Sequence, residues 1–580
     1  DRPPVVLIHG STLTGHADWR GVAPLLATRY RVIVPDCRGH GQSEGTHSYT
    51  FKELAADTAA LIRALGYERA HLIGHSNGGN VVLVTLLEHP DVVQTCVPQA
   101  ANAYVSQDLI DKEPIIFDPD RVARDAPGWR DEMIALHGAT HGPDYWRELL
   151  KLTVDEIISQ PRYTPDDLAR VRRPVLVIQG ECDSVNAPMR HAQFIAQHIP
   201  YAELWIPAGI GHNVHVDAPL DWLARIFDFL DRRGDDLNEA LYRLQQARYA
   251  DARATIFDVR YDAAARTATG VVLTPHQRRA ALKLLPTGGR DQIRVLLTAN
   301  APWALVNRPV ADVRREPRRS AEQTTQLLIG EAVRVLREDD DWVQVRLERD
   351  GYLGWARANS LHRCDERAAA RYRAASKYLI AAPLAPAYDR PSRHAAPAGQ
   401  LPFTVSLPLI DRRGKFAALR LPDDRVWWVE AAVLLNRAQR PRPTSSGIQA
   451  ALDSIRQLIG VPYLWGGCSP FGYDCSGLTQ AFYRFMGVSI PRDADQQYAA
   501  GLPVTGEPQA GDLLFFGGDD DDLIDPRRAH VTHVAISLGG DELIHANGAT
   551  WGIAYNSLNP ARPIYRAWLK DHLVGVRRFR

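Results

Sequence analysis

Short apolar runs rich in β-branched residues alternate with helical stretches through residues 3–234. The runs are "PVVLIHG", "RVIVPD", "HLIGHS" and "PVLVIQG", and "FKELAADTAALIRALG" is one of the helical stretches between them. Strands of a parallel sheet are covered on both faces and need crossover helices, so this alternation predicts a parallel sheet packed between helices. Residues 105–170 interrupt it with helical, Trp-bearing sequence, which we expect to form a lid over the sheet.

The remaining chain changes pattern several times. Its 580 residues exceed what one core can organise, and roughly three to five domains are expected. A small α+β region is predicted at residues 235–298. Strand and turn signals then predict two small all-β barrels of the SH3-like kind, at residues 299–365 and 370–436. A Pro- and Arg-rich linker leads into a C-terminal domain of helices and strands at residues 447–580.

Charge and cysteine usage exclude several classes of protein. Lys plus Arg and Asp plus Glu both number 68, which gives a formal net charge of zero and favours neither nucleic acid nor an anionic membrane. No apolar run reaches the length of a membrane span, and no signal peptide precedes "DRPPVVLIHG". The six cysteines show no metal-binding spacing, so we expect reduced, mostly buried thiols, no metal and no cofactor. These features predict a cytoplasmic location, or an exported protein if a leader was trimmed. They identify no partner protein.

A serine stands where a strand runs into a helix. In "HLIGHSNGGN", Ser76 lies between glycines that permit a strained turn, which lifts its hydroxyl above the sheet edge. Backbone amides of Asn77 and of Ser11, or of Thr12, are candidates for stabilising an oxyanion. The "HG" loop, the "D-x-R-G-x-G-x-S" loop in "PDCRGHGQS" and the Gly-x-Ser-x-Gly turn resemble the α/β-hydrolase family over residues 1–234.

This resemblance implies a catalytic triad in the chain order Ser, Asp, His. Ser76 would attack an acyl carbon, His212 of "PAGIGHNVHVDAP" would take its proton, and Asp183 of "VIQGECDSVNAP" would orient the imidazole. Glu181 is the alternative acid and His215 the alternative base. The substrate is expected to be a small acyl compound, and whether it is an ester, an amide or a peptide stays open.

A cysteine begins a second candidate site in "GYDCSGLTQAFYRF". Apolar residues follow Cys475 at helical spacing, so a helix begins at or near it and ends at Gly487. A helix N-terminus is expected to lower the pKa of the thiol. Twelve residues separate His533 from His545, which suits two neighbouring strands joined by the "GGD" turn.

Several motifs in order resemble the NlpC-type, papain-like cysteine peptidases of bacterial cell-wall metabolism. They are "PYLWGG", "YDCSGL", "IPRDADQQ", "AGDLLFF" and "THVAISL", within residues 447–580. The resemblance implies cleavage next to D-glutamate in peptidoglycan stem peptides. It also implies that Cys475 is the nucleophile, His533 the base and His545 the orienting residue. Cys468 is expected to be an inert buried thiol.

Two SH3-like modules before such a domain resemble the γ-D-glutamyl-L-diamino-acid endopeptidases, which require a free L-alanine amine. By this resemblance, four positions shape the oxyanion and amine pockets: Tyr463, Asp474, Ser476 and Asp493. In the first barrel, Tyr352 and either Glu322 or Glu316 are candidates for completing an ammonium site, because a carboxylate and a phenol suit a cation. Ala494 departs from relatives that have serine, which puts one substrate hydrogen bond in doubt.

The insert "GGDDDDLIDPRRA" lengthens the loop before His533. Its four consecutive aspartates lack the ligand spacing of a calcium loop and are expected to be solvated. The barrel tryptophans Trp342, Trp355, Trp427 and Trp428 are expected to be core residues rather than a platform for a ligand.

Together these patterns predict a bifunctional hydrolase with a serine site and a cysteine site. Its peptide substrates are expected to derive from peptidoglycan. One alternative is that the front domain is an inactive binding module, which leaves the cysteine site as the only working one. Another makes the barrels wall-binding anchors of an exported hydrolase.

Overall fold

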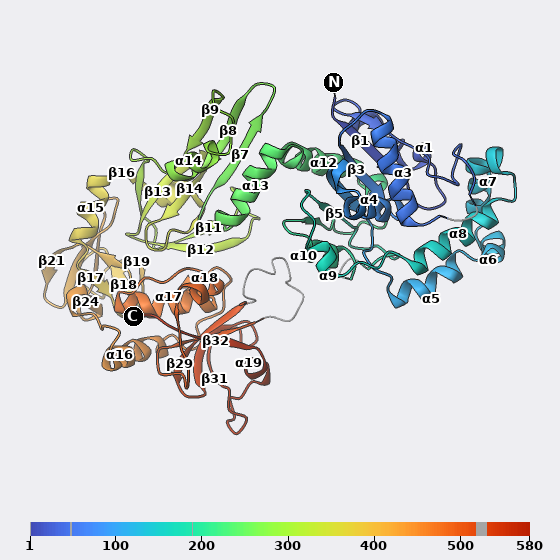
Figure 1. The fold of residues 1–580 in the computed structure, drawn as a ribbon. Helices are drawn as coiled ribbons and strands as arrows, with labels where there is room; N and C mark the ends of the chain where they lie inside the picture. The colour runs from blue at the N-terminus through green and yellow to red at the C-terminus, as the bar shows by residue number, and fades with distance from the viewer. Residues whose placement is uncertain (1, 47–48, 188–189, 518–530) are drawn as a thin grey trace. The chain divides into compact units, whose positions relative to one another are not determined.

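The computed structural model describes residues 2–46, 49–187, 190–517 and 531–580 (Figure 1). The chain divides into two compact units, and the boundary between them passes through residues 249–292. The first unit holds residues 1–248 and the second holds the chain from residue 293 to the end. Four consecutive aspartates expected to be solvated, 519–522, lie outside the described residues.

A six-stranded parallel sheet forms the centre of the first unit, in the order β2-β1-β3-β4-β5-β6. The strands are β1 (Pro4–Ile8), β2 (Arg31–Ile33), β3 (Ala70–His75), β4 (Val93–Gln99), β5 (Leu176–Ile178) and β6 (Glu203–Trp205). Alternate residues of β1 enter two different cores, with Val6 and Ile8 in one and Val5 and Leu7 in the other. Both faces are therefore covered, as the apolar runs predict.

Helices cover these faces. The longer ones are α3 (Phe51–Ala64), α4 (Asn77–Glu88), α10 (Ala192–His198) and α12 (Pro219–Arg233). Residues of α3, α4 and α10 join the core that holds Val6, whereas α12 joins the core that holds Val5. The predicted α/β-hydrolase architecture is confirmed.

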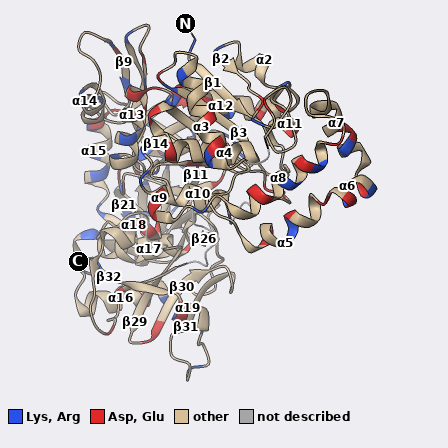
Figure 2. Ribbon diagram, turned by 45° about the vertical axis from the view of Figure 1, so that its right-hand side comes forward, with Lys and Arg blue, Asp and Glu red and all other residues tan. Residues whose placement is uncertain are grey.

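The predicted helical lid is also present. It consists of α5 (Gln107–Ile116), α6 (Pro119–Asp125), α7 (Pro127–His141) and α8 (Trp146–Ser159). These helices bury a small core of their own around Met133 and Trp146. Acidic and basic residues are interspersed along these helices (Figure 2), with ion pairs such as Arg147 to Asp120 at 2.8 Å. Mixed charges of this kind make a solvated surface rather than a docking face for a polyanion.

Residues 235–298 contain two helices and a three-stranded sheet in the order β7-β8-β9. The elements are α13 (Asp236–Arg248), β7 (Phe257–Asp262), β8 (Thr267–Val272), α14 (Pro275–Leu282) and β9 (Arg290–Val295). This matches the predicted α+β segment.

Two all-β modules follow. The first is a seven-stranded sheet in the order β12-β11-β15-β14-β13-β10-β16. Its strands are β10 (Trp303–Val306), β11 (Val310–Arg314), β12 (Gln323–Leu328), β13 (Ala332–Asp339), β14 (Trp342–Leu347), β15 (Leu353–Arg357) and β16 (Leu361–Cys364). Helix α15 (Glu366–Ala375) connects it to the second module.

The second module combines a three-stranded sheet, β20-β17-β24, with a five-stranded sheet, β19-β18-β23-β22-β21. Its strands are β17 (Tyr378–Ile380), β18 (Leu384–Tyr388), β19 (Pro397–Pro402), β20 (Ser406–Leu407), β21 (Leu409–Arg413), β22 (Phe416–Arg420), β23 (Val426–Glu430) and β24 (Leu434–Asn436). All four barrel tryptophans of the sequence prediction are less than one-tenth exposed, which confirms them as core residues.

The C-terminal domain places a buried helix against an antiparallel sheet. The helices are α16 (Ser445–Arg456), α17 (Cys475–Met486), α18 (Ala494–Ala500) and α19 (Ala567–Asp571). The six-stranded sheet has the order β27-β32-β28-β29-β30-β31. These strands are β27 (Leu502–Pro503), β28 (Leu513–Phe516), β29 (His533–Gly539), β30 (Glu542–Asn547), β31 (Gly552–Ser557) and β32 (Leu573–Arg578). Helix α17 begins at Cys475 and ends before Gly487, whose φ of 80° is the left-handed cap conformation, as predicted.

All six cysteines are free, but only Cys96, Cys468 and Cys475 are buried, so the expectation of mostly buried thiols is only half right. Cys182 is exposed because it lies in a turn beyond β5. Among the described residues, no helix is both long and apolar enough to cross a membrane.

Candidate active sites

Ser76 occupies a strained turn between β3 and α4. Its φ of 55° and ψ of −121° are sparsely populated for a residue with a side chain. The turn depends on its glycines. A Cβ on Gly74 would lie 2.0 Å from the carbonyl oxygen of Gly78, and one on Gly78 would lie 2.2 Å from that of Ile8. The sequence Gly-x-Ser-x-Gly is therefore what this geometry requires.

Asp183 and His212 come together beyond β5 and β6. His212 Nδ1 lies 2.9 Å from Asp183 Oδ2, and Asp183 Oδ1 accepts from the backbone N–H groups of Val185 and Asn186. Burial alone would raise the pKa of Asp183, but the hydrogen bond and charge of His212 and the two N–H groups outweigh it, so the pKa is lowered. A carboxylate held in this way can fix the tautomer of His212 and stabilise an imidazolium.

The alternative acid and base lie elsewhere. Glu181 accepts from the N–H of Gly209 at 2.8 Å. His215 is buried and lies 3.1 Å from Asp18 Oδ1. The structure therefore joins His212 to Asp183 and joins neither alternative to a triad partner.

Asp18, which sequence reasoning missed, links three parts of the serine site. It accepts from the N–H of Gly10 at 2.8 Å. It also lies 3.0 Å from Nδ1 of His75, the residue before Ser76, and 3.1 Å from His215. A Cβ on Gly10 would lie 3.4 Å from the Cβ of Ser76, so the loop that begins at Gly10 packs against the turn. Asp18, His75 and His215 are close enough to hold a metal ion, but hydrogen bonding accounts for their contacts.

The lid reaches both candidate oxyanion groups. His137 Nε2 lies 2.9 Å from the carbonyl oxygen of Thr12, next to Ser11, and the side-chain amide of Asn77 donates to Glu156 at 3.1 Å. Burial raises the pKa of Glu156 well above its ordinary range. The lid therefore adds a buried carboxyl group beside Asn77, the residue after Ser76.

Cys475 is the first residue of α17, and Asp474 caps the helix by accepting from the N–H of Gly477 at 2.6 Å. Burial raises the pKa of the Cys475 thiol to about 12, and the charge of Asp474 adds to this effect. The N–H groups of Val534 and Ser476 act in the opposite direction but do not outweigh burial. The predicted lowering of the thiol pKa is therefore wrong for this structure, since burial exceeds the influence of the helix N-terminus.

His533 and His545 lie on adjacent antiparallel strands β29 and β30, and their side chains meet diagonally across the pair. Asn556 on β31 donates its amide to the carbonyl oxygen of Ile564, which turns its Oδ1 toward His545 Nε2 at 2.8 Å. His545 Nε2 then carries the proton, and its Nδ1 accepts from His533 Nε2 at 2.6 Å. This assignment leaves His533 Nδ1 unprotonated. Asn547, whose Oδ1 accepts from Thr550, also directs its amide nitrogen to the same Nε2 at 2.9 Å, and it makes no hydrogen bond there in this tautomer.

Both imidazoles are neutral at ordinary pH. Burial, and then the neighbouring His545, lower the pKa of His533 well below its usual value. Burial lowers the pKa of His545 to about 4. A neutral histidine with a free ring nitrogen is a proton acceptor.

Asp474 and Ser476 are engaged by a buried arginine that sequence reasoning missed. Arg492 donates two hydrogen bonds to Asp474, at 2.6 and 3.0 Å, and one to Ser476 Oγ at 2.8 Å. It also donates to Thr325 of the first barrel. These contacts hold the start of α17 against the barrel, so the two predicted pocket residues have a positioning role.

The barrel also contacts the residue that follows Arg492. The Tyr352 hydroxyl donates to Asp493 Oδ2 at 3.0 Å. Of the two candidate acids, Glu322 accepts from the exposed indole of Trp465 at 2.9 Å, whereas Glu316 pairs with Arg318 on an exposed turn. Glu322 is thus the acid that contacts the C-terminal domain.

Two further predicted positions lie in this region. Tyr463 is close enough to Cys475 that the thiolate charge raises its pKa, after the larger effect of burial. Ala494 begins α18 directly after Asp493 and is buried. The position at which relatives can have serine is therefore a buried one next to Asp493.

Arg253 shows that residues 235–298 do contribute chemistry, which the sequence did not reveal. Its guanidinium donates to Asp493 Oδ2 at 2.8 Å and to both oxygens of Asp495 at 2.7 and 2.8 Å. Asp251 accepts the remaining two N–H groups, so all five donors are used. The carboxylate that contacts Tyr352 is therefore already paired with a cation of the chain.

Comparisons with known proteins agree with this organisation. Family models match as follows: the α/β-hydrolase fold at residues 3–157, the bacterial dipeptidyl-peptidase SH3 domain at 313–361 and the NlpC/P60 family at 460–578. Over 265 residues, the chain is 30% identical to a Bacillus cereus protein named γ-D-glutamyl-L-lysine dipeptidyl-peptidase, covering 44% of this chain and 74% of that protein.

The front of the chain has different relatives. Over 223 residues it is 29% identical to the human serine hydrolase BPHL, covering 37% of this chain and 74% of that protein. A crystal structure of an NlpC/P60 family protein from Bacillus cereus matches with a TM-score of 0.41 and 23% identity, covering 48% of this chain and 99% of that one.

Proposed function

Since the chain belongs to the NlpC/P60 family and also carries an α/β-hydrolase domain, we propose two separate reactions for it. The C-terminal domain is a cysteine endopeptidase that cleaves the bond between γ-D-glutamate and a diamino acid in peptidoglycan stem peptides with a free N-terminal L-alanine. The name of the Bacillus cereus relative supports this substrate class. The front domain is a serine hydrolase of a small acyl compound.

The cysteine site supports a direct proton transfer. The thiol of Cys475 gives its proton to His533 Nδ1 as the sulfur attacks the γ-carbonyl carbon, and the imidazolium then protonates the departing amine. Water hydrolyses the thioester and returns the proton to sulfur. His545 and Asn556 hold the tautomer that leaves Nδ1 free.

The contact of Tyr352 with Asp493 carries the substrate proposal. It joins the barrel to the catalytic domain, and the chain of contacts from Asp493 through Arg492 to Asp474 ends beside Cys475. A phenol oxygen and a carboxylate together accept the hydrogens of an ammonium group. Arg253 shares Asp493, so the pocket offers the substrate a partly neutralised carboxylate.

Acetylation of the L-alanine amine should lower kcat/KM for the tripeptide L-Ala-γ-D-Glu-L-Lys. Tyr352→Phe should reduce the preference for the free amine by about 5- to 10-fold, the worth of one hydrogen bond. Product formation measured by mass spectrometry gives both rates. Tyr388→Phe, in the second barrel, is the matched control and should keep the wild-type preference. Equal turnover of free and acetylated peptides by the wild type would refute the ammonium role.

Asn556→Leu should lower kcat of peptide cleavage by about 10²-fold with little change in KM, since His545 loses the acceptor that sets its tautomer. Asn556→Asp keeps an accepting oxygen and should recover much of kcat. Steady-state kinetics with that tripeptide measure both values. Asn559→Leu, three residues away in the next turn, should behave as wild type. If Asn556→Leu changed only KM, the positioning role would be wrong.

A further inference from the structure

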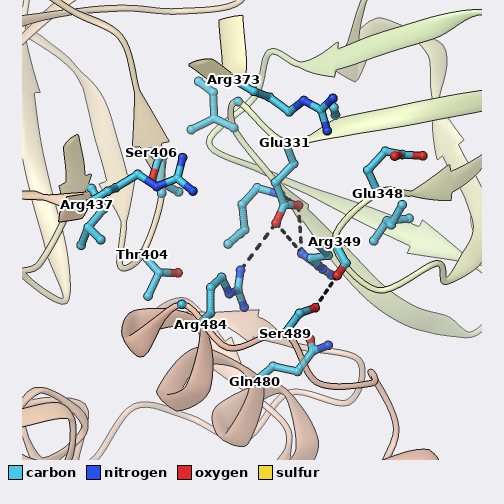
Figure 3. A pocket seen from close by; sticks show the side chains of 18 of the residues that line it. Glu331, Glu348, Arg349, Arg373, Thr404, Ser406, Arg437, Gln480, Arg484 and Ser489 are labelled. Carbon is cyan, nitrogen blue, oxygen red and sulfur yellow. Dashed lines mark hydrogen bonds and ion pairs between the residues drawn. The ribbon is translucent and has the colours of Figure 1, made fainter. Parts of the chain in front are cut away.

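A cavity of about 330 Å³ lies within the second unit, and no residue of either candidate active site lines it. It is lined by the first barrel near Glu331, by the second barrel near Thr404 and Arg437, and by α17 at Arg484 (Figure 3). Arg484 follows Cys475 by nine residues, which is about 14 Å along a helix. The volume is at the lower end of the range for small-molecule sites, about 300–1,000 Å³.

The lining has an excess of positive charge. Five guanidinium groups face two carboxylates in this cavity: Arg349, Arg373, Arg437, Arg440 and Arg484 against Glu331 and Glu348. Glu331 is already shared, because Arg349 donates to it at 2.8 and 2.9 Å and Arg484 lies 3.5 Å away. Glu348 pairs with Arg346. Arg349 also pairs with Asp350 at 3.0 Å. Within the described residues, the guanidinium groups that pair with no carboxylate are therefore those of Arg373, Arg437 and Arg440.

Three buried donor atoms in the cavity have no hydrogen-bond partner among the described residues. Both terminal nitrogens of Arg484 are buried without a hydrogen bond, and so is the hydroxyl of Thr404. Thr404 is only 7% exposed and has a φ of 68°, a conformation that costs a β-branched residue energy. Buried donors without acceptors are rare and call for a ligand.

Arg440 and Arg437 add to this imbalance. A Cβ on Gly487 would lie 1.9 Å from Arg440 Cζ, so the guanidinium packs directly on the end of α17. In the described part of the chain, the Arg440 side chain has no ion pair or hydrogen bond. Burial, and then the charge of Arg440, lower the pKa of Arg437. A lone arginine near a helix C-terminus is explained by the helix dipole, but this convergence of like charges is not.

We propose that this cavity binds the phosphate group of a small molecule or inorganic phosphate itself. Guanidinium groups bind phosphate oxygens bidentately, and the Thr404 hydroxyl supplies a neutral donor. Such a ligand compensates the charge and satisfies the buried donors of Arg484 and Thr404. Binding joins α17 to both barrels, because the lining residues come from all three.

Calorimetric titration of the full chain at fixed ionic strength tests whether the cavity binds phosphate. Inorganic phosphate, pyrophosphate and glucose 1-phosphate are the probes, and the tightest of them identifies the form of phosphate preferred. We expect saturable binding of one ligand per chain. The Arg437→Ala/Arg440→Ala variant and Thr404→Val should each weaken it by about 10-fold or more. Without phosphate, the double variant should keep wild-type peptide and ester hydrolysis, which shows that it folds.

Arg367→Ala/Arg371→Ala is the matched control, since both arginines lie on α15 outside the cavity lining. It should bind as wild type. The proposal is overturned if the wild type shows no saturable binding, if the cavity variants bind like the control, or if citrate binds as tightly as pyrophosphate. None of these outcomes depends on which peptide the cysteine site cleaves.

Discussion

Cys475→Ala is expected to abolish release of L-Ala-γ-D-Glu from L-Ala-γ-D-Glu-L-Lys, with kcat/KM reduced by about 10⁴-fold or more. In the proposed mechanism the sulfur forms the covalent intermediate, and alanine offers no atom that can replace it. Hydrolysis of a small p-nitrophenyl ester should be unchanged, because that reaction belongs to the other domain. Mass spectrometry of the peptide products and absorbance of nitrophenolate measure the two reactions on one preparation.

Cys468→Ala is the matched control for this substitution. Its thiol is also buried and lies seven residues earlier, and it donates to the backbone oxygen of Gln326 in the first barrel. Both activities should survive it. Simultaneous loss of peptide and ester hydrolysis in Cys475→Ala would contradict the model of two independent sites. Continued peptide cleavage would assign the nucleophile elsewhere.

Local patterns in the sequence were sufficient to predict the elements that carry both nucleophiles. The spacing of Leu478, Phe482 and Phe485 marks one buried face of a helix, and an aspartate before Cys475 caps it. Similarly, the glycines around Ser76 are needed within the turn itself. These features depend on residues that are close together in the chain, so they can be recognised in a single sequence.

The missed residues depend on contacts between distant segments. Arg253 binds Asp493 across 240 residues, and Arg492 binds Thr325 across 167. Asn556 can contact His545 only because β31 pairs with β30 in the folded sheet. No periodic pattern in the sequence indicates which distant residues will be partners. The prediction of a lowered thiol pKa is wrong for the same reason. The burial of Cys475 arises from the packed domain and not from the helix that begins there.

The structure also separates the roles of neighbouring acids. Asp474 and Asp493 both lie near the cysteine, but Asp474 is committed to the helix cap and Arg492, whereas Asp493 faces the barrel and Tyr352. Burial raises the pKa of Asp493 despite its cationic neighbours. Asp493 is therefore the acid that a substrate ammonium can influence.

Ser76→Ala is expected to give the reverse pattern to Cys475→Ala. Ester hydrolysis should fall by about 10⁴-fold or more, because the variant lacks the hydroxyl that His212 activates. Release of L-Ala-γ-D-Glu should be unchanged. Ser159→Ala, at the end of lid helix α8, is the matched control and should keep both activities. The same two assays measure all three proteins.

A fluorophosphonate probe tests the serine site without knowledge of its substrate. It reacts with an activated serine as fluoride leaves, so the wild type should be labelled once per chain and Ser76→Ala not at all. Asp183→Asn should be labelled much more slowly, since the lowered pKa of Asp183 reflects a carboxylate that holds His212. If the wild type stayed unlabelled while its peptidase worked, the front domain would be a binding module. The strained φ of Ser76 argues against that outcome, because a turn with no catalytic task has no need to store strain.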